Sequence, residues 1–259
     1  MQFSTGYTFG FATVICVVCG IGVAGSAVAL KDLQDANAVL DRQTKVLAVV
    51  GLVDESTATP EQVKDLFAKR IKPLVVELKT GKPAEGIDAM TFDQSVEAKD
   101  PAIGFDAPAG NKAKVLRMPK HGLVYQVVGE SGKVERLIIP VEGKGLWSTL
   151  YGYLAIESDA DTIAGLTFYK HGETPGLGGE VDNPRWKALW PGRKIRNAKG
   201  VPTIQVAKGS VGSASEAPNK VDGLSGATLT CNGVTYLLQF WVGEHGFGPY
   251  LEGVRAKKG

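Results

Sequence analysis

The longest apolar stretch of the chain lies near its N-terminal end. No charged residue occurs from Tyr7 to Leu30, and most positions there are aromatic, β-branched or small. About 20 consecutive apolar residues in a helix cross the hydrocarbon core of a bilayer. We therefore expect residues 1–31 to form a transmembrane anchor. A cleaved secretory signal is the alternative, because Ala27-Val28-Ala29 resembles a cleavage site, but no Lys or Arg precedes the stretch, which is also longer than an ordinary signal core.

The charges beside this stretch leave its orientation open. Lys31, Arg42 and Lys45 follow it and no basic residue precedes it. Positive-inside counting therefore places the domain that follows in the cytoplasm. Aspartates are interspersed among these basic residues, however, and long domains cross membranes largely regardless of charge.

Helical patterns come next along the chain. Residues 33–52 carry apolar side chains at the spacing of one helix face. Thr59-Pro60-Glu61 is typical of a helix start, with a capping hydroxyl before a proline. Residues 82–112 are polar, contain scattered Gly and Pro, and lack a clear period, so we expect loops there.

The second half of the chain has the pattern of a sheet followed by helices. Four β-like runs are separated by short polar turns at residues 130–132 and 158–161. A Gly-rich loop, a short helix around Trp186, a strand and a last helix follow. Strands in one block flanked by helices predict an α+β domain with a mixed or antiparallel sheet. The expected strands are 123–128, 137–141, 151–156, 163–169 and 203–206; the Gly-rich loop is 171–179 and the last helix 233–242.

Composition and missing motifs exclude several classes of function. The net charge is only +2 and no basic stretch is interleaved with aromatics, so we expect no nucleic-acid partner. Neither a phosphate-binding Gly-x-x-x-x-Gly-Lys-Ser/Thr loop nor a Gly-x-Ser-x-Gly nucleophile motif occurs, and zinc-ligand spacing is absent. Cys16 and Cys19 fit small apolar positions of the anchor, with a redox or metal pair as the alternative, and Cys231 stands alone. We nominate no metal ligand and no catalytic acid or base.

Two small-residue segments are the candidate functional features. The first, Asp222 to Thr230, would place Thr228 on a tight turn at a helix start, where free backbone N–H groups and the helix dipole suit a phosphate. From these residues alone, a plain turn with Thr230 as the helix cap is the favoured interpretation. The second is the loop 171–179, whose N–H groups could lie against a planar ligand; a simple strand-to-helix connection explains it equally well.

The turn before Thr228 and several longer motifs together resemble a known family. Ser225-Gly226-Ala227-Thr228 resembles the flavinylation motif of the FMN-binding domain family, in which the final threonine carries FMN through a phosphoester bond. The single apolar N-terminal segment and several ungapped motifs, in the family's order over nearly the whole chain, are similar to the C subunit of the Na+-translocating NADH:quinone oxidoreductase. These motifs are residues 42–48, 145–153, 173–178 and 246–250.

The resemblance implies a role for individual residues. Thr228 takes the position of the phosphoester-linked threonine. Asp222, Ser225, Gly226 and Ala227 match the motif read by the Mg2+-dependent flavin transferase that delivers FMN from FAD. The positions matching the loop that packs beside the flavin are Glu173, Thr174, Leu177 and Gly178, and Trp147 and Ser148 are further expected flavin contacts.

The resemblance also implies an organisation and a function. Residues 1–31 would be the anchor, 32–115 a membrane-proximal helical and loop part, and 116–259 the FMN-binding domain. The chain would be a single-pass subunit of a respiratory sodium pump in the bacterial inner membrane, with its soluble domain in the periplasm and with partner subunits, lipid and the flavin transferase around it. Its covalent FMN would relay electrons while other subunits turn over NADH and quinone. The alternatives are the equivalent subunit of an Rnf-type complex, a tethered scaffold without flavin, and a secreted hydrolase using Ser225.

Overall fold

The computed structural model describes residues 4–257 and divides the chain into two compact units, residues 1–42 and 43–259. The first unit consists of helix α1, which runs from Thr5 to Ala48 and so continues into the second unit. Among the described residues, α1 is the one helix long and apolar enough to cross a membrane. Residues 1–3 of the expected anchor and residues 258–259 lie outside the described part.

The separate helix expected at 33–52 is instead the C-terminal part of α1. No Pro or Gly interrupts residues 27–48, so nothing in the backbone ends the helix where the apolar stretch stops. The helix ends at Ala48, and Gly51 just beyond it has a φ of 71°, which fits the left-handed position after a helix. The Gly51 N–H donates to Ala48 O and the Leu52 N–H to Leu47 O, as in a Schellman motif.

Helix α2 (Pro60–Arg70) confirms the predicted helix start. Thr59 and Gln62 form a capping box in which each side chain accepts a hydrogen bond from the other residue's backbone N–H. The chain passes directly from α2 into strand β1 (Ile71–Glu77), which the sequence pattern did not predict. Pro73 lies inside β1 and is tolerated because β1 is an edge strand.

The main sheet has five antiparallel strands in the order β1-β4-β5-β6-β7. Its last four strands are the four β-like runs of the sequence, each extended by one or more residues. The turn at 145–148 between β5 and β6 was not predicted, whereas the predicted turns at 130–132 and 158–161 join β4 to β5 and β6 to β7. Gly132 and Ala160 take left-handed φ values in those turns. The strands are β4 (His121–Val128), β5 (Val134–Lys144), β6 (Thr149–Glu157) and β7 (Ile163–Lys170).

The remaining elements are short apart from one long helix near the C-terminus. The last predicted helix is α5, which begins five residues earlier than expected, and a further helix, α6, follows it. The expected strand at 203–206 shrinks to β8, which pairs in parallel with β9. These elements are α3 (Gln94–Lys99), β2 (Phe105–Asp106), β3 (Arg117–Met118), the 3-10 helix η1 (Gly178–Asp182), α4 (Pro184–Lys187), β8 (Gln205–Val206), β9 (Lys220–Val221), α5 (Thr228–Trp241) and α6 (Gly248–Ala256).

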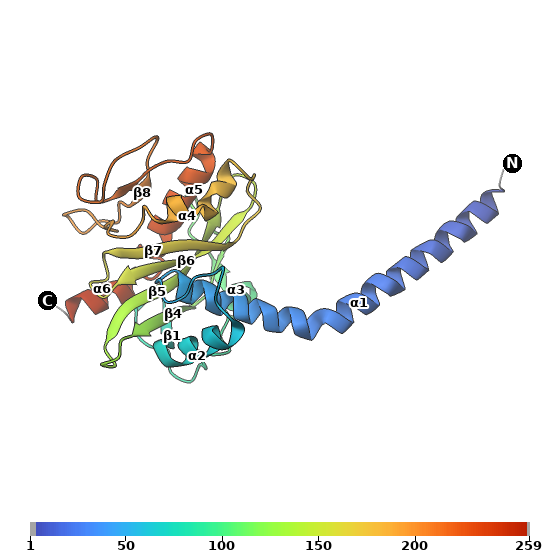
Figure 1. Ribbon diagram of the computed structural model, residues 1–259, viewed down its shortest axis with the longest axis horizontal. Coiled ribbons are helices and arrows are strands. Elements are labelled where there is room, and N and C mark those ends of the chain that lie inside the picture. Colours follow the sequence, from blue (N-terminus) through green and yellow to red (C-terminus); the bar gives the residue numbers. More distant parts are fainter. Residues whose placement is uncertain (1–3, 258–259) are drawn as a thin grey trace. The chain divides into compact units, whose positions relative to one another are not determined.

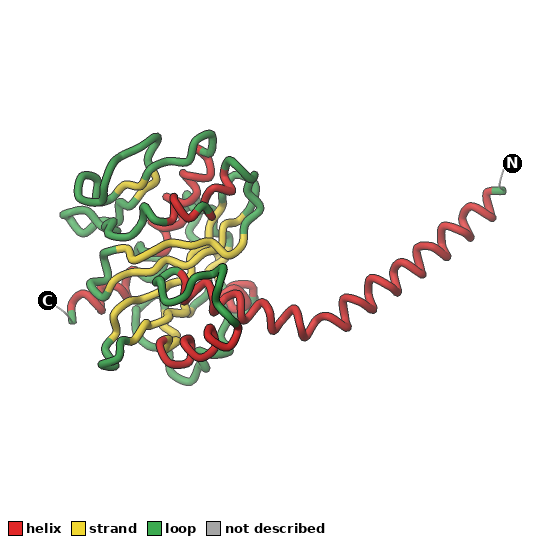
Figure 2. The backbone as a smooth tube through the Cα atoms, viewed as in Figure 1, coloured by secondary structure: helices red, strands yellow, loops and turns green. Residues whose placement is uncertain are grey.

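Helices cover both faces of the sheet (Figure 1). On one face α5 packs so closely on β5 that a Cβ at Gly143 would lie 2.5 Å from the Leu237 Cβ. The Trp241 indole N–H also donates to the Glu142 carbonyl, at 2.7 Å. The other face receives α2 and the end of α1, with Phe67 in edge contact with Tyr125. Figure 2 shows that long loops join the short elements near α5.

Candidate functional site

The turn before α5 presents Thr228 at the surface. Gly226 has φ 70°, which directs the chain into the helix, and the buried Ala227 is the N-cap residue. Thr228 is the first residue of α5 and is exposed. No side chain caps this end of α5. The first turn of a helix has N–H groups without helical partners, so this end can bind an anion beside the Thr228 hydroxyl.

Thr230 does not act as the helix cap that the residues alone favoured. The helix starts two residues earlier, and the Thr230 hydroxyl is buried inside the first turn. It donates instead to the Glu173 Oε2, at 2.7 Å. This bond joins positions 57 residues apart, and it connects the turn with the Gly-rich loop.

Glu173 is the centre of a hydrogen-bond cluster that joins three chain segments. Glu173 is only 5 % exposed. Oε1 accepts from the N–H groups of Trp147 and Ser148, both at 3.0 Å, and from the Ser148 hydroxyl at 3.2 Å. Oε2 accepts from the Leu146 N–H at 3.2 Å and from Thr230. The β5–β6 turn, the Gly-rich loop and the first turn of α5 therefore share one acceptor.

The hydrogen bonds to the Glu173 carboxylate keep it ionised. Burial by itself would raise the pKa of Glu173, because it penalises the charged form. The Thr230 hydroxyl and the backbone N–H groups of residues 146–148 outweigh that effect and lower the pKa below its ordinary value. Glu173 is therefore a buried anion at neutral pH.

Glycines allow these segments to approach. A Cβ at Gly178 would lie 2.5 Å from the Thr230 Oγ1, and one at Gly145 would lie 2.7 Å from the Glu173 Oε1. A Cβ at Gly226 would lie 2.8 Å from the Leu177 Cδ2, so the tip of the Gly-rich loop touches the turn. The structure thus brings the two candidate motifs of the sequence into one site.

Large apolar side chains lie exposed on the segments that meet here. Trp147 is 67 % exposed, and the others are more than 40 % exposed. Exposed apolar residues that gather on adjoining segments are typical of a ligand or partner surface. Leu177 and Trp147 were nominated through the family resemblance, whereas Leu146 and Leu229 were missed because nothing in the sequence pattern marked them. The side chains are Leu146, Trp147, Leu177 and Leu229.

Other predicted residues lie at the edge of this site. Ser225 is exposed in the turn, and Thr174 is exposed in the loop, where its carbonyl accepts from the N–H groups of Leu177 and Gly179. The Asp222 carboxylate turns to the preceding loop and accepts from the Ser210 hydroxyl and the Val211 N–H, both at 2.8 Å. Asp222 therefore ties the turn before α5 to the preceding loop and does not point into the site.

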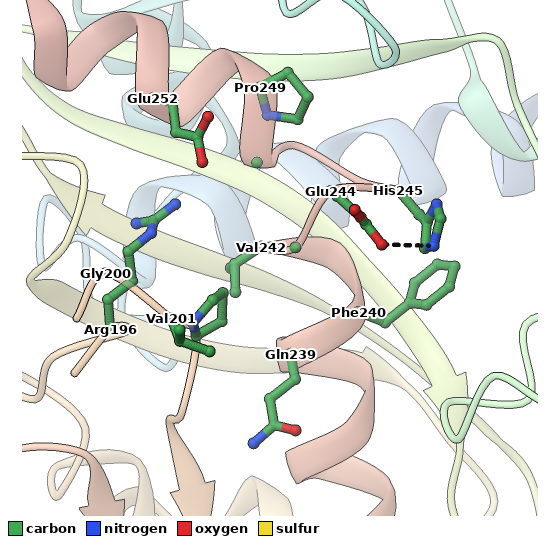
Figure 3. A pocket seen from close by; sticks show the side chains of 13 residues that line it. Arg196, Gly200, Val201, Gln239, Phe240, Val242, Glu244, His245, Pro249 and Glu252 are labelled. Atoms are coloured by element: carbon green, nitrogen blue, oxygen red, sulfur yellow. Dashed lines mark ion pairs between the residues drawn. The ribbon is translucent and has the colours of Figure 1, made fainter.

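A cavity of about 480 Å³ lies at the opposite end of α5 and contains none of the predicted site residues (Figure 3). Its walls carry charges of both signs. The buried Arg196 donates to the Ala160 carbonyl at 3.0 Å and lies 3.7 Å from the Asp161 Oδ1, and His245 lies 3.3 Å from Glu244. Since α5 has 14 residues, a helix of this length separates the cavity from Thr228 by about 20 Å.

The structure offers no alternative centre built from metal-ligand side chains. Within residues 4–257, no three His, Cys, Asp or Glu residues gather as a metal site. Cys16 and Cys19 are exposed on α1, whereas Cys231 is buried behind the turn, where its sulfur accepts from the Leu224 N–H at 3.3 Å. Burial raises the pKa of the Cys231 thiol, so it is a poor nucleophile.

Comparison with known proteins identifies the family to which the chain belongs. Residues 145–243, which include the β5–β6 turn, the Gly-rich loop and the first turn of α5, match the family model of the FMN-binding domain. The C subunit of the Na(+)-translocating NADH-quinone reductase of Pseudomonas aeruginosa is 48% identical over 256 residues, covering 98% of this chain and 97% of that protein. The protein of the same name from Vibrio anguillarum is 46% identical, covering 93% of this chain and 91% of its own.

Solved structures of proteins from the same subunit family also match this chain. NqrC of Shewanella oneidensis matches with a TM-score of 0.76 and 35% identity, over 83% of this chain and 97% of that one. The C subunit of the same reductase from Parabacteroides distasonis matches with a TM-score of 0.67 and 26% identity, over 86% and 96%. The chain therefore belongs to the NqrC family, the C subunits of the Na(+)-translocating NADH-quinone reductase.

Proposed function

We propose that this chain is a membrane-anchored flavoprotein subunit that carries FMN in phosphoester linkage to the Thr228 hydroxyl. The observation that carries the proposal is the exposed threonine at an uncapped helix start inside the FMN-binding domain match. A phosphate attached there would find unpaired N–H groups of the first turn and the positive end of the helix dipole.

The surroundings of Thr228 also fit the flavin ring. An isoalloxazine ring is planar and largely apolar, so it needs apolar surface with a few polar groups. Leu146, Trp147, Leu177 and Leu229 provide exposed apolar surface. The Gly-rich loop between Thr174 and Gly178 adds backbone polar groups. When bound, FMN supplies the redox chemistry, while the protein fixes its position and tunes its surroundings.

Attachment requires a second protein during maturation. We propose that a Mg2+-dependent flavin transferase reads the segment from Asp222 to Ala227 and transfers the FMN part of FAD to Thr228. The Thr228 oxygen forms the new bond to the FMN phosphorus, the pyrophosphate bond of FAD breaks, and AMP and the hydroxyl proton leave. Three features support this: Ser225 and Gly226 are exposed, Gly226 gives the turn its left-handed bend, and Asp222 anchors the turn to the loop before it. The attacking hydroxyl is therefore accessible on a rigid turn.

We further propose that the chain relays electrons inside the sodium-translocating complex while other subunits bind NADH and quinone. In this proposal α1 crosses the bacterial inner membrane among lipids, and the FMN-binding domain lies in the periplasm. The full-length relatives support this complex over an Rnf-type one. The length and composition of α1 support the anchor.

Substitution of Thr228 tests the attachment. In a host that contains the transferase, wild-type protein should give a flavin-fluorescent band on a denaturing gel. Thr228→Val, which keeps the shape and removes the hydroxyl, should abolish the band, and Thr228→Ser, which keeps a hydroxyl, should retain it. A fluorescent band in the Thr228→Val lane would contradict attachment at this residue.

The relay is tested in the assembled complex. With Thr228→Val, NADH oxidation by an artificial acceptor at the NADH-binding subunit should continue, whereas Na+-dependent quinone reduction should fall to background. Undiminished quinone reduction by a complex without this flavin would rule the relay out.

A further inference from the structure

The Glu173 carboxylate is bound in a way that requires an anion. It accepts five hydrogen bonds, three from backbone N–H groups and two from hydroxyls, and it donates none. An ionised carboxylate is an acceptor-only group with about four lone-pair sites. A neutral amide would turn an NH2 group toward some of these donors and leave them unpaired.

Within the described residues 4–257, the negative charge of Glu173 has no basic side chain as a salt-bridge partner. No Lys, Arg or His side chain forms a salt bridge with it among residues 4–257. Only N–H and hydroxyl dipoles and the N-terminal end of α5 stabilise the charge. Because the group is buried, its field is screened much less than that of a surface charge.

Every donor to Glu173 belongs to a segment of the proposed flavin site. Leu146, Trp147 and Ser148 form the β5–β6 turn, and Thr230 lies two residues after the attachment threonine. Gly145 and Gly178 exclude any side chain from the space between these segments and the carboxylate. Movement of Glu173 would therefore move the turn, the loop and the helix start together.

We propose that Glu173 is a positioning residue that also sets the reduction potential of the flavin: its carboxylate holds the site's three segments in place, and its fixed charge makes reduction of the flavin less favourable. The inference rests on the proposed attachment of FMN to Thr228. Glu173 acts on the flavin through its electric field and through the residues that it positions. Direct hydrogen bonding to the flavin is not proposed, because both carboxylate oxygens already accept hydrogen bonds from those residues.

Redox titration of the flavinylated full-length protein tests this inference. The midpoint potential is followed by flavin absorbance in wild type, Glu173→Gln, Glu180→Gln and Thr230→Val. Glu180 is the control carboxylate, since it lies seven residues further along the chain, in η1, and accepts from the side chain of Asn183, the residue after η1. Thr230→Val removes one donor and keeps the charge.

We expect Glu173→Gln to shift the midpoint to more positive values by about a tenfold change in the reduction equilibrium, which is 59 mV for one electron. Glu180→Gln should leave the midpoint unchanged. Thr230→Val should leave it unchanged or make it more negative, because the charge remains and loses a stabilising dipole.

Two results would overturn the inference. One is a Glu173→Gln protein that carries flavin, melts at a lower temperature and has the wild-type potential, since Glu173 would then be structural only. The other is a midpoint potential of Thr230→Val that is more positive than that of wild type. This second result is the deciding one if Glu173→Gln takes up no flavin. Wild-type protein without covalent flavin would instead refute the proposed attachment, so the two failures are distinguishable.

Discussion

At the scale of single residues, the site depends on glycine positions where a side chain would clash with a neighbouring segment. Gly226 combines a left-handed φ of 70° with contact to Leu177. An L-residue in that conformation costs about 1–2 kcal/mol. The atom in its way is the end of a flexible, exposed side chain, so Leu177 can move aside. A Cβ at Gly226 would therefore change the position of Leu177 more than it changes stability.

Substitution of Gly226 by Ala separates these two effects. We expect Gly226→Ala to lower the free energy of unfolding by about 1–2 kcal/mol and to reduce flavin incorporation. Gly132→Ala is the control, because Gly132 has φ 76°, lies in the β4–β5 turn and has open space around its Cβ position. It should show the same loss of stability with full flavin incorporation. Equal flavin incorporation in both variants would exclude a role for the Gly226–Leu177 contact.

Some residue roles could be anticipated and others could not. The motif around Thr228 stands out by its small residues, and the family resemblance pointed to Glu173. The link between Glu173 and Thr230 spans 57 positions and depends on how a loop folds over a helix start. Local pattern carries no information on such a contact. For the same reason, Thr230 looked like a cap from its neighbours alone.

Among the helices and strands, hydrophobic pattern predicted four strands of the main sheet and missed the edge strand β1. The strands β4 to β7 have apolar runs because most of their residues are buried, although β7 also lies at an edge of the sheet. Strand β1 carries Pro73, which argues against a central strand and is harmless at an edge. The boundary of α5 was missed because its first turn is made of Thr, Leu and Cys rather than a regular apolar face.

Helix α5 owes its position to a glycine that faces the sheet. A Cβ at Gly233 would lie 2.4 Å from the Lys144 carbonyl oxygen and 3.1 Å from the Gly145 Cα, and both atoms belong to the backbone. Neither can move aside as a side chain does. The close approach therefore holds α5 against the end of β5, where the turn that binds Glu173 begins.

Two glycine-to-alanine substitutions in helices should have opposite signs. Gly233→Ala should destabilise the protein by about 1–3 kcal/mol, because the overpacked helix must shift. Gly253→Ala, in α6 with open space around its Cβ position, should stabilise it by about 0.5–1 kcal/mol through helix propensity. Urea unfolding of the two variants measures both values. A stabilising Gly233→Ala would contradict the packing of α5 on β5.

The molecule as a whole is organised as an apolar helical segment and a folded domain. The division lies at Arg42, inside α1, and not where the apolar stretch ends. Beyond this point Val46 and Leu47 are completely buried in the second unit. The last turns of α1 therefore belong to the core of the domain, which the pattern of charges alone did not indicate.

Truncation locates this boundary. A chain that starts at Gln43 should be soluble without detergent and should unfold cooperatively. A chain that starts at Gly51 should be severely destabilised, because loss of Val46 and Leu47 alone removes about 1.5–3 kcal/mol each of burial energy. Thermal unfolding of both chains is the measurement. Equal melting temperatures would show that the end of α1 is dispensable.

The proposed function depends on one covalent bond, which peptide mass spectrometry can locate. Protein purified from a host with the flavin transferase is digested with trypsin, and the peptide that contains Thr228 is weighed and fragmented. We expect a mass increase of one FMN less one water, with the fragment series placing it on Thr228. An unmodified peptide, or the same mass on Ser225 or Thr230, would contradict the proposed attachment.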